Sequence, residues 1–342
     1  MAQFPSTRYQ GSKAKIGNWI GEQVKALPFK TCLDAFGGTG AVSHRLKRAG
    51  KQVTYNDILR FNYYIGLALI ENSRARLTSA DIDHLLQRHH DTIYPDFIQE
   101  TFRNIYFTEE ENIWLDQTIT NIRDLKNKYK RALALFSLFQ ACIIKRPYNL
   151  FHRKNLYVRL ANVKRSFGNK ASWDAPFERW FRVFAEEANK AVFDNGLQNH
   201  ATCLDAVKVE GEYDLVYIDT PYISRRSVGV DYQQFYHFLE GITIYDKWGE
   251  QIDYSSKHRR LLTVESEWCD KRRIYTAFDR LFDRFKDSIL VVSYRSDGTP
   301  SEGELVDLMR KYKTSMRVEH YGAYKYVLSK NGDSKEILII GS

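Results

Sequence analysis

The chain has 342 residues, of which 43% are hydrophobic and 27% charged, a composition that is typical of a globular protein and excludes a disordered or fibrous one. Four scattered cysteines without a paired spacing argue against a disulfide framework or a zinc ribbon. The polar residues 1–13 do not predict a secretory signal. The apolar run at 132–144 is too short to span a bilayer and predicts a buried helix. We therefore expect a cytoplasmic protein that does not cross a membrane.

The positive charge is concentrated in one part of the chain. The formal net charge is +9, and residues 126–182 contain 14 Lys and Arg against two acids, Asp174 and Glu178. The remaining residues include 37 basic and 40 acidic side chains, so this window holds all of the excess positive charge. Such a local concentration is typical of proteins that bind nucleic acid. Solvated helix faces that happen to be basic are the alternative.

The first predicted elements form a strand–helix–strand unit. An apolar run at residues 31–36 leads into the glycine-rich residues 37–40, which predicts a strand followed by a tight turn. Apolar residues at helical spacing predict a helix over 41–49. A second short strand over 53–55 leads to Asp57.

The later elements extend this pattern after a long interruption. Residues 81–180 have an irregular helical pattern, and strand patterns return at 202–206, 213–218 and 288–294. Two further strand patterns near the end of the chain, at 317–327 and 336–340, predict a closing antiparallel pair.

The predicted fold class is α/β, with a doubly wound, mostly parallel sheet that ends in an antiparallel pair. Residues 1–75 and 195–342 are expected to form this sheet domain. Residues 76–194 are expected to form an inserted domain that is mainly helical and basic.

The glycine turn favours a ligand that contains ribose. Asp57 follows Gly38 by 19 residues, which suits an acid that accepts hydrogen bonds from ribose hydroxyls. The third glycine of a dinucleotide fingerprint is replaced by Ser43, and the Gly-Lys-Ser/Thr of a phosphate-binding loop is absent. The pattern therefore favours a ligand without a pyrophosphate over NAD or ATP. A plain tight turn without a ligand is the alternative.

A second candidate site is Asp219-Thr220-Pro221-Tyr222, which follows the strand at 213–218. Pro221 restricts Thr220 to an extended conformation, so the Thr220 carbonyl can lie beside the Asp219 carboxylate. Two fixed acceptors can hold both hydrogens of an exocyclic amino group, and Tyr222 can stack on the ring that carries it. A strand end with a turn proline and a packing tyrosine is the alternative.

The order of these motifs resembles that of the DNA adenine-N6 methyltransferases that use S-adenosylmethionine (AdoMet). The matching residues are Tyr9-Gln10-Gly11-Ser12-Lys13, then 34–40, Asp57, a basic insertion and 219–222. In this resemblance the cofactor motif comes first and the recognition region precedes the catalytic motif. The chain has Tyr9, Ser12 and Thr220 where the family more often has Trp, Gly and Pro.

The resemblance implies a role for each matched residue. Asp219, Thr220, Pro221 and Tyr222 form the catalytic motif, and an Asp at its first position favours adenine over N4-cytosine. AdoMet is the expected cofactor, and its expected contacts are Tyr9, Lys13, Asp34, Phe36, Gly38, Gly40, Asp57 and Asp205. The nine histidines show no metal-ligand spacing, and methyl transfer to an amine needs no metal, so no metal is expected.

The densest basic cluster, at residues 145–155, is the expected contact with double-stranded DNA. Arg and Lys suit phosphates and guanine edges, and Asn suits adenine edges. The residues expected at the DNA are Lys145, Arg146, Tyr148, Asn149, His152, Arg153 and Asn155, with Arg225 and Arg226 on the phosphates of a flipped nucleotide. A solvated basic loop over the helix at 132–144 is the alternative.

These observations predict a site-specific DNA adenine methyltransferase that flips its target base and serves restriction-modification or epigenetic marking. The predicted enzyme is a monomer near the nucleoid, and any cognate restriction endonuclease acts separately. Three alternatives remain open: an N4-cytosine or RNA amine methyltransferase, a non-catalytic DNA-binding protein on the same scaffold, and an NAD-dependent oxidoreductase, which Ser43 and the basic insertion disfavour.

Overall fold

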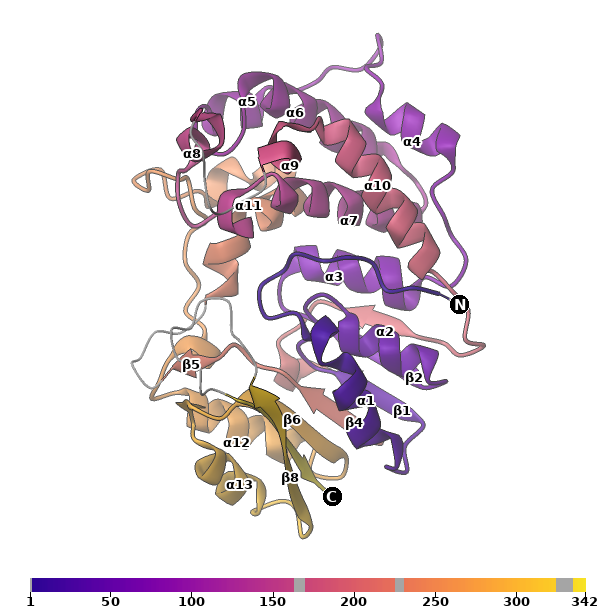
Figure 1. Cartoon of the computed structure of the whole chain (residues 1–342), viewed down its shortest axis with the longest axis vertical. Helices are drawn as coiled ribbons and strands as arrows, with labels where there is room; N and C mark the ends of the chain where they lie inside the picture. The colour runs from indigo at the N-terminus through magenta and orange to yellow at the C-terminus, as the bar shows by residue number, and fades with distance from the viewer. Residues whose placement is uncertain (1, 163–169, 225–230, 324–334) are drawn as a thin grey trace. The chain divides into compact units, whose positions relative to one another are not determined.

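The computed structural model describes residues 2–162, 170–224, 231–323 and 335–342, which divide into two compact units (Figure 1). The helical unit consists of Met1–Tyr9, Leu67–Asp194 and Tyr232–Thr263. The sheet unit consists of Gln10–Gly66, Asn195–Asp231 and Val264–Ser342.

The sheet unit contains a seven-stranded sheet in the order β3-β2-β1-β4-β6-β9-β8. Its strands are β1 (Thr31–Asp34), β2 (Gln52–Asn56), β3 (His200–Thr202), β4 (Leu215–Ile218), β6 (Ile289–Arg295), β8 (Met316–Ala323) and β9 (Lys335–Gly341). The first five strands in this order are parallel, and β9 is antiparallel to both of its neighbours. A separate two-stranded pair joins β5 (Ile223–Ser224) to β7 (Gly298–Thr299). The predicted fold class is therefore confirmed.

Helices cover both faces of this sheet because its central strands are apolar on both sides. They are α1 (Gly17–Lys25), α2 (Ala41–Arg48), α3 (Arg60–Gly66), α12 (Ile274–Arg284) and α13 (Glu302–Met309). Leu33, Val216 and Leu290 pack with α12 and α13 in one buried cluster, whereas the alternate side chains Cys32 and Val291 are buried on the opposite face. Figure 1 shows α12 and α13 on one side of the strands and α1 and α2 on the other.

The third strand differs in position from its prediction. β3 is His200–Thr202, whereas the sequence pattern indicated 202–206. The Asp205 carboxylate accepts a hydrogen bond from the Val207 backbone N–H at 3.2 Å and begins a 3-10 turn, so the chain cannot remain extended there.

The helical unit is built around one buried helix. Its helices are α4 (Ser79–Leu86), α5 (Phe97–Thr101), α6 (Glu109–Asp124), α7 (Lys128–Ile144), α8 (Leu156–Leu160), α9 (Lys170–Asp174), α10 (Phe177–Ala191) and α11 (Tyr232–Thr243). Every residue of α7 from Ala132 to Ile144 is buried, which confirms the predicted buried helix. The α10 helix packs against α7 through an apolar face that includes Phe181, Ala185 and Ala188.

The insertion expected over residues 76–194 lies within the helical unit, which also includes residues 2–9, 67–75 and 232–263 that were expected in the sheet domain. That this unit recognises DNA remains a prediction. No helix in the described residues is both long and apolar enough to cross a membrane.

Candidate active site

The glycine turn between β1 and α2 has a backbone conformation that favours glycine. Gly38 and Gly40 have positive φ values of 52° and 75°, in the left-handed region. A Cβ atom at Gly37 would lie 2.0 Å from the Tyr55 ring. The turn is also fastened to β2, because the Gly37 N–H donates to the Asn56 carbonyl at 2.7 Å. The backbone of the turn can therefore approach a ligand closely.

Asp57, at the end of β2, lies directly beside this turn. One of its oxygens, Oδ2, accepts hydrogen bonds from the Gly38 N–H at 2.9 Å and from Asn62 Nδ2 at 3.0 Å. Burial raises the pKa of Asp57 to about 6, although these hydrogen bonds favour the carboxylate. The structure thus brings together the acid and the glycine turn that the sequence pairs by spacing.

Asp34, the last residue of β1, is a buried acid with one unused oxygen. Ser43 Oγ donates a 2.6 Å hydrogen bond to its Oδ2, whereas its Oδ1 has no hydrogen-bond partner among the described residues. Burial, together with the negative charges of Asp219 and Asp57, raises the pKa of Asp34 to about 7, although the hydrogen bond from Ser43 lowers it. Ser43, which occupies the place of a fingerprint glycine, therefore has a structural role in holding Asp34.

The strand order places these acids at one edge of the sheet. β1 and β4 are parallel neighbours, and the chain proceeds from β1 to β2 and β3 on one side and continues with β4 on the other. Ligands of doubly wound sheets bind outside the carboxyl ends of the strands at this kind of reversal. Asp34 is the last residue of β1 and Asp219 directly follows β4, the two strands that flank this reversal.

Asp219 is held by Lys13 and Tyr222. Lys13 Nζ lies 2.7 Å from Asp219 Oδ1 and 2.6 Å from Tyr222 Oη, and Tyr222 Oη lies 2.9 Å from the same Asp219 oxygen. All hydrogen bonds from described residues fall on Oδ1, so Asp219 Oδ2 remains available as an acceptor. Burial raises the pKa of Asp219 to about 6, against the lowering effect of Lys13.

Glu336 completes this cluster, although it belongs to none of the motifs in the sequence. Its fully buried Oε1 lies 2.7 Å from Tyr222 Oη, 2.7 Å from Ser293 Oγ and 3.3 Å from Lys13 Nζ. A single acid in an otherwise apolar terminal strand was the only signal in the sequence. Glu336 therefore fixes the positions of Lys13 and Tyr222, which in turn hold Asp219.

Three more residues that were predicted to act in catalysis or cofactor binding are Thr220, Phe36 and Tyr9, and each has different neighbours. Thr220 is buried, and no described donor hydrogen-bonds to its carbonyl oxygen. The Phe36 ring lies edge-on to Trp268 with a centroid distance of 5.0 Å. Tyr9 belongs to the helical unit, where its ring stacks on Tyr236 at 4.6 Å.

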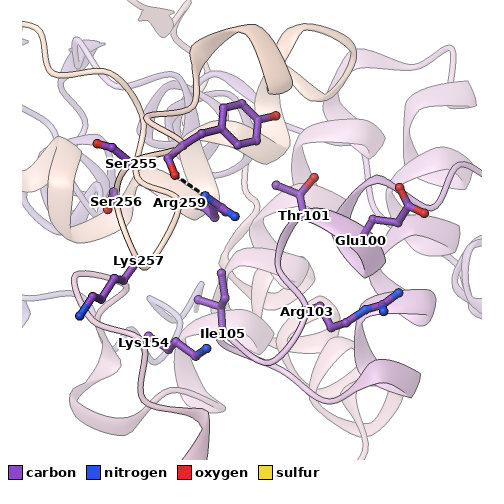
Figure 2. Close-up of a pocket in the computed structure, with 10 residues that line it drawn as sticks. Glu100, Thr101, Arg103, Ile105, Lys154, Ser255, Ser256, Lys257 and Arg259 are labelled. Atoms are coloured by element: carbon purple, nitrogen blue, oxygen red, sulfur yellow. Dashed lines mark hydrogen bonds between the residues drawn. The ribbon is translucent and has the colours of Figure 1, made fainter.

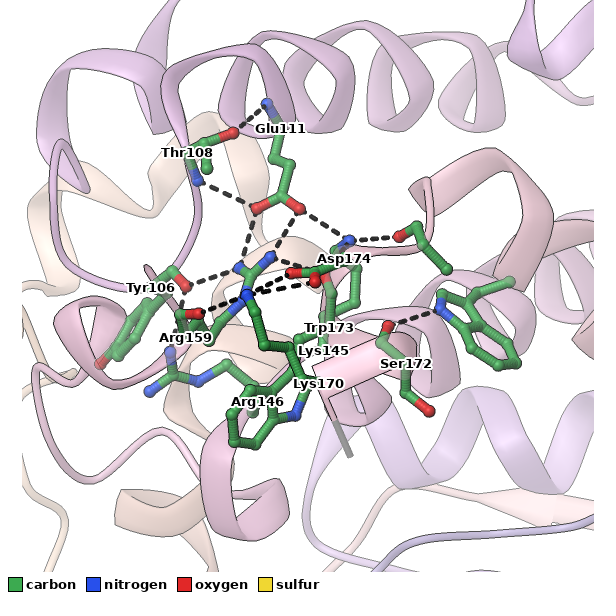
Figure 3. Close-up of polar contacts among 12 residues, drawn as sticks. Tyr106, Thr108, Glu111, Lys145, Arg146, Arg159, Lys170, Ser172, Trp173 and Asp174 are labelled. Carbon is green, nitrogen blue, oxygen red and sulfur yellow. Dashed lines mark hydrogen bonds and ion pairs between the residues drawn. The ribbon is translucent and has the colours of Figure 1, made fainter. Parts of the chain in front are cut away.

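The structure corrects the expectation that Lys145, Arg146 and Asn155 contact DNA, because all three side chains are buried. Lys145 Nζ lies 2.7 Å from Glu111 Oε1 and donates to the Trp173 carbonyl at 2.8 Å (Figure 3). The Arg146 guanidinium donates to the Tyr106 carbonyl and to Asn155 Oδ1. These charged groups hold the interior of the helical unit together instead of facing a partner.

Other residues of the cluster at 145–155 remain accessible. Tyr148 is 62% exposed and has a positive φ of 64°, and Arg153 is exposed as well. Burial lowers the pKa of His152 to about 4, so this side chain is uncharged at neutral pH. Arg225 and Arg226 lie outside the described residues.

A substitution at Asp34 tests the electrostatics of this site. The raised pKa means that the contribution of Asp34 to stability is fully present below about pH 4 and is lost as the pH rises to about 7. In the protein without ligand, we expect Asp34→Asn to gain stability relative to wild type by about 1 kcal/mol for each pH unit across that interval. Urea unfolding at pH 5 and pH 8 measures the difference. If the difference in unfolding free energy between Asp34→Asn and wild type is the same at both pH values, the result would contradict the burial of an ionised Asp34.

The family model and the relatives that match this chain are all named as methyltransferases. The model of the family "D12 class N6 adenine-specific DNA methyltransferase" matches residues 9–286. Type II methyltransferase M2.HphI of Haemophilus parahaemolyticus is 29% identical over 90% of this chain and 88% of its own length. Type II methyltransferase M.CviAII of Paramecium bursaria Chlorella virus 1 is 22% identical over 96% and 95%. Type II methyltransferase M.FokI of Planomicrobium okeanokoites is 25% identical over 93% of this chain and 48% of its own length.

The family match covers most of the chain and confirms the resemblance inferred from the motif order. It also confirms the predicted class of enzyme, a DNA methyltransferase that acts on the N6 amino group of adenine. Family membership implies AdoMet as the methyl donor and DNA as the substrate. The chain belongs to the D12 class of N6 adenine-specific DNA methyltransferases.

Proposed function

We propose that this enzyme methylates a flipped adenine within a specific double-stranded DNA sequence, and that its active site lies at the carboxyl ends of β1, β2 and β4. The observation that carries the proposal is the arrangement of three acids at that edge, of which Asp34 and Asp57 are buried and Asp219 is partly buried. The names of the relatives, which are type II methyltransferases and modification methylases, favour a role in restriction-modification. A cytoplasmic monomer with a separate restriction endonuclease is part of the proposal.

The residues at this edge fit AdoMet. The unpartnered Oδ1 of Asp34 can accept a hydrogen bond from an ammonium group, and Asp57 can accept bonds from ribose hydroxyls. The glycine turn lets the backbone approach the ligand because it carries no side chains at Gly38 and Gly40. We assign these four residues to the cofactor. When bound, AdoMet supplies an electrophilic methyl group on a sulfonium.

In the proposed mechanism, Asp219 and Thr220 hold the amino group of the target base. Lys13 and Tyr222 anchor Asp219 Oδ1, which leaves Oδ2 to accept one amine hydrogen. The Thr220 carbonyl accepts the other hydrogen. These bonds draw electron density toward the amine nitrogen and orient its lone pair, so the contribution of the protein is mainly positioning and electrostatics.

Binding of AdoMet to an Asp57→Asn variant tests the cofactor assignment. The loss of hydrogen bonds to a charged acceptor costs about 1.5–3 kcal/mol, so we expect the dissociation constant to rise at least about tenfold. Asp287→Asn, an exposed acid of the same unit, is the matched control and should bind normally. Isothermal titration calorimetry measures both. Unchanged binding by Asp57→Asn would exclude Asp57 from the cofactor site.

A further inference from the structure

The helical unit contains a basic cavity that neither the sequence motifs nor the family match indicates. It has a volume of about 500 Å³ and is lined by three segments of the chain: residues 100–105, Lys154, and the loop at 254–259 (Figure 2). The lining contains four cations, Arg103, Lys154, Lys257 and Arg259, and one carboxylate, Glu100. The cavity therefore has a net charge of about +3 at neutral pH.

Most of this charge is not neutralised by the protein itself. Arg103, Lys154 and Lys257 are exposed, and none of them forms an ion pair or side-chain hydrogen bond with a described residue. Elsewhere in the unit, by contrast, cations such as Lys130 and Arg182 are paired with acids. A concave surface with unpaired positive charge attracts anions and concentrates them.

The loop that carries Lys257 and Arg259 has a defined shape. Ile252 and Leu261 form an antiparallel bridge at its base, and the Asp253 N–H donates to the Arg260 carbonyl at 2.9 Å. Arg260 Nε also donates to Asp253 Oδ2 at 3.1 Å. The cations are therefore presented on a braced hairpin.

Tyr106 joins this hairpin to the segment that carries Lys154. Its buried hydroxyl oxygen lies 2.8 Å from the His258 carbonyl and 2.6 Å from the Phe151 carbonyl. His237 Nε2 lies 2.7 Å from the same hydroxyl, and burial lowers the pKa of His237 to about 3, so it is neutral. Two walls of the cavity are thus fixed relative to each other. Binding of a ligand therefore costs less conformational entropy than binding to mobile walls would.

We propose that this cavity binds the phosphate backbone of the DNA substrate. The chemistry favours a phosphodiester chain because the ligating groups are long, exposed cations spread over a space much larger than one phosphate. Tyr254, which is 54% exposed and lies 5.3 Å below the Arg259 guanidinium, adds a surface for contact with a sugar or base. This inference rests on the proposed function, and it extends the expected DNA contact from Lys154, near the end of the cluster at 145–155, to Arg103 and to the loop at 254–259.

A triple variant tests the inference: Arg103→Gln with Lys154→Gln and Lys257→Gln. Each lost phosphate contact lowers the magnitude of the slope of log K against log salt concentration by about 0.9, so we expect a reduction of about 2–3. The dissociation constant for duplex DNA should rise at least about tenfold, and AdoMet binding should be unchanged. The matched control is Arg88→Gln with Lys126→Gln and Lys247→Gln, which removes the same charges from exposed sites of the same unit and should keep the wild-type slope. Lys257→Glu alone should weaken DNA binding if the triple variant does not fold.

The outcomes separate this inference from the proposed function. A wild-type slope and affinity in the folded triple variant, or in Lys257→Glu, would overturn the inference, even if the wild-type enzyme methylates DNA. Loss of binding to inorganic phosphate or ATP with unchanged binding to DNA would also overturn it. A reduced salt slope in a protein whose wild type methylates no DNA would support the cavity and contradict the proposed function.

Discussion

Asp219→Asn is expected to lower kcat for adenine methylation by at least about 10²–10³-fold, the effect of removing one preorganised electrostatic contact to a reacting group. The amide keeps the size of the side chain but loses the charge that polarises the amine, and it replaces the carboxylate 2.7 Å from Lys13 with a neutral group. Steady-state kinetics at saturating DNA and AdoMet measure the loss. Both substrates should still bind within a few-fold of wild type.

Asp219 also determines how kcat depends on pH. Asp219 carries the negative charge that polarises the amine only as a carboxylate, and burial raises its pKa to about 6. We therefore expect kcat to fall as the pH decreases through about 6 and to be constant above about 7.

An Asp219→Asn variant that keeps activity within about fivefold of wild type would contradict the assigned role, since preorganised contacts of this kind contribute far more. Asp287→Asn provides the matched exposed control.

Glu111→Ala is expected to lower the free energy of unfolding by about 3–5 kcal/mol, because it leaves buried cations without their partner. Arg159 donates to both Glu111 oxygens at 2.7 and 2.8 Å, and Lys145 lies 2.7 Å from one of them. Glu111 also accepts the Thr108 N–H in a capping box that begins α6. Urea unfolding of the full chain measures the change.

The control for this prediction is Glu178→Ala. Glu178 pairs with Arg182 one helical turn away, but both side chains are about half exposed, so the loss should be about 0.5 kcal/mol.

Although burial raises the pKa of Glu111, the charges of Arg159 and Lys145 lower it below its ordinary value. This contribution to stability is therefore present above about pH 4.3 and is lost as the pH falls further. Equal losses in the two variants would contradict a buried network at Glu111.

Local sequence patterns were sufficient to predict the core of the sheet unit. The glycine turn and Asp57 lie within one strand–helix–strand unit, so spacing along the chain determines their spatial relation. The tetrapeptide at 219–222 likewise follows directly from the strand that precedes it. These parts of the candidate site depend on contacts that are close in sequence.

The other parts of the candidate site depend on contacts between residues that are far apart in the sequence, and no local pattern shows such contacts. Glu336 reaches Tyr222 only because β9 inserts between β6 and β8, far along the chain from the catalytic motif. Lys145 has the composition of a surface cation, and its burial depends on Glu111 from a different helix. The basic residues at 257–260 lie outside the charged window at 126–182, and only folding shows that they share a cavity with Lys154.

The most direct test of the account is analysis of DNA after incubation with the purified protein and methyl-labelled AdoMet, followed by digestion to nucleosides. The account predicts that the label appears in N6-methyladenine, at a single short sequence motif, and that Asp219→Ala abolishes it. Label in N4-methylcytosine, or in RNA alone, would contradict the proposed substrate. Absence of label from a protein that binds both AdoMet and DNA would contradict the proposed catalytic site.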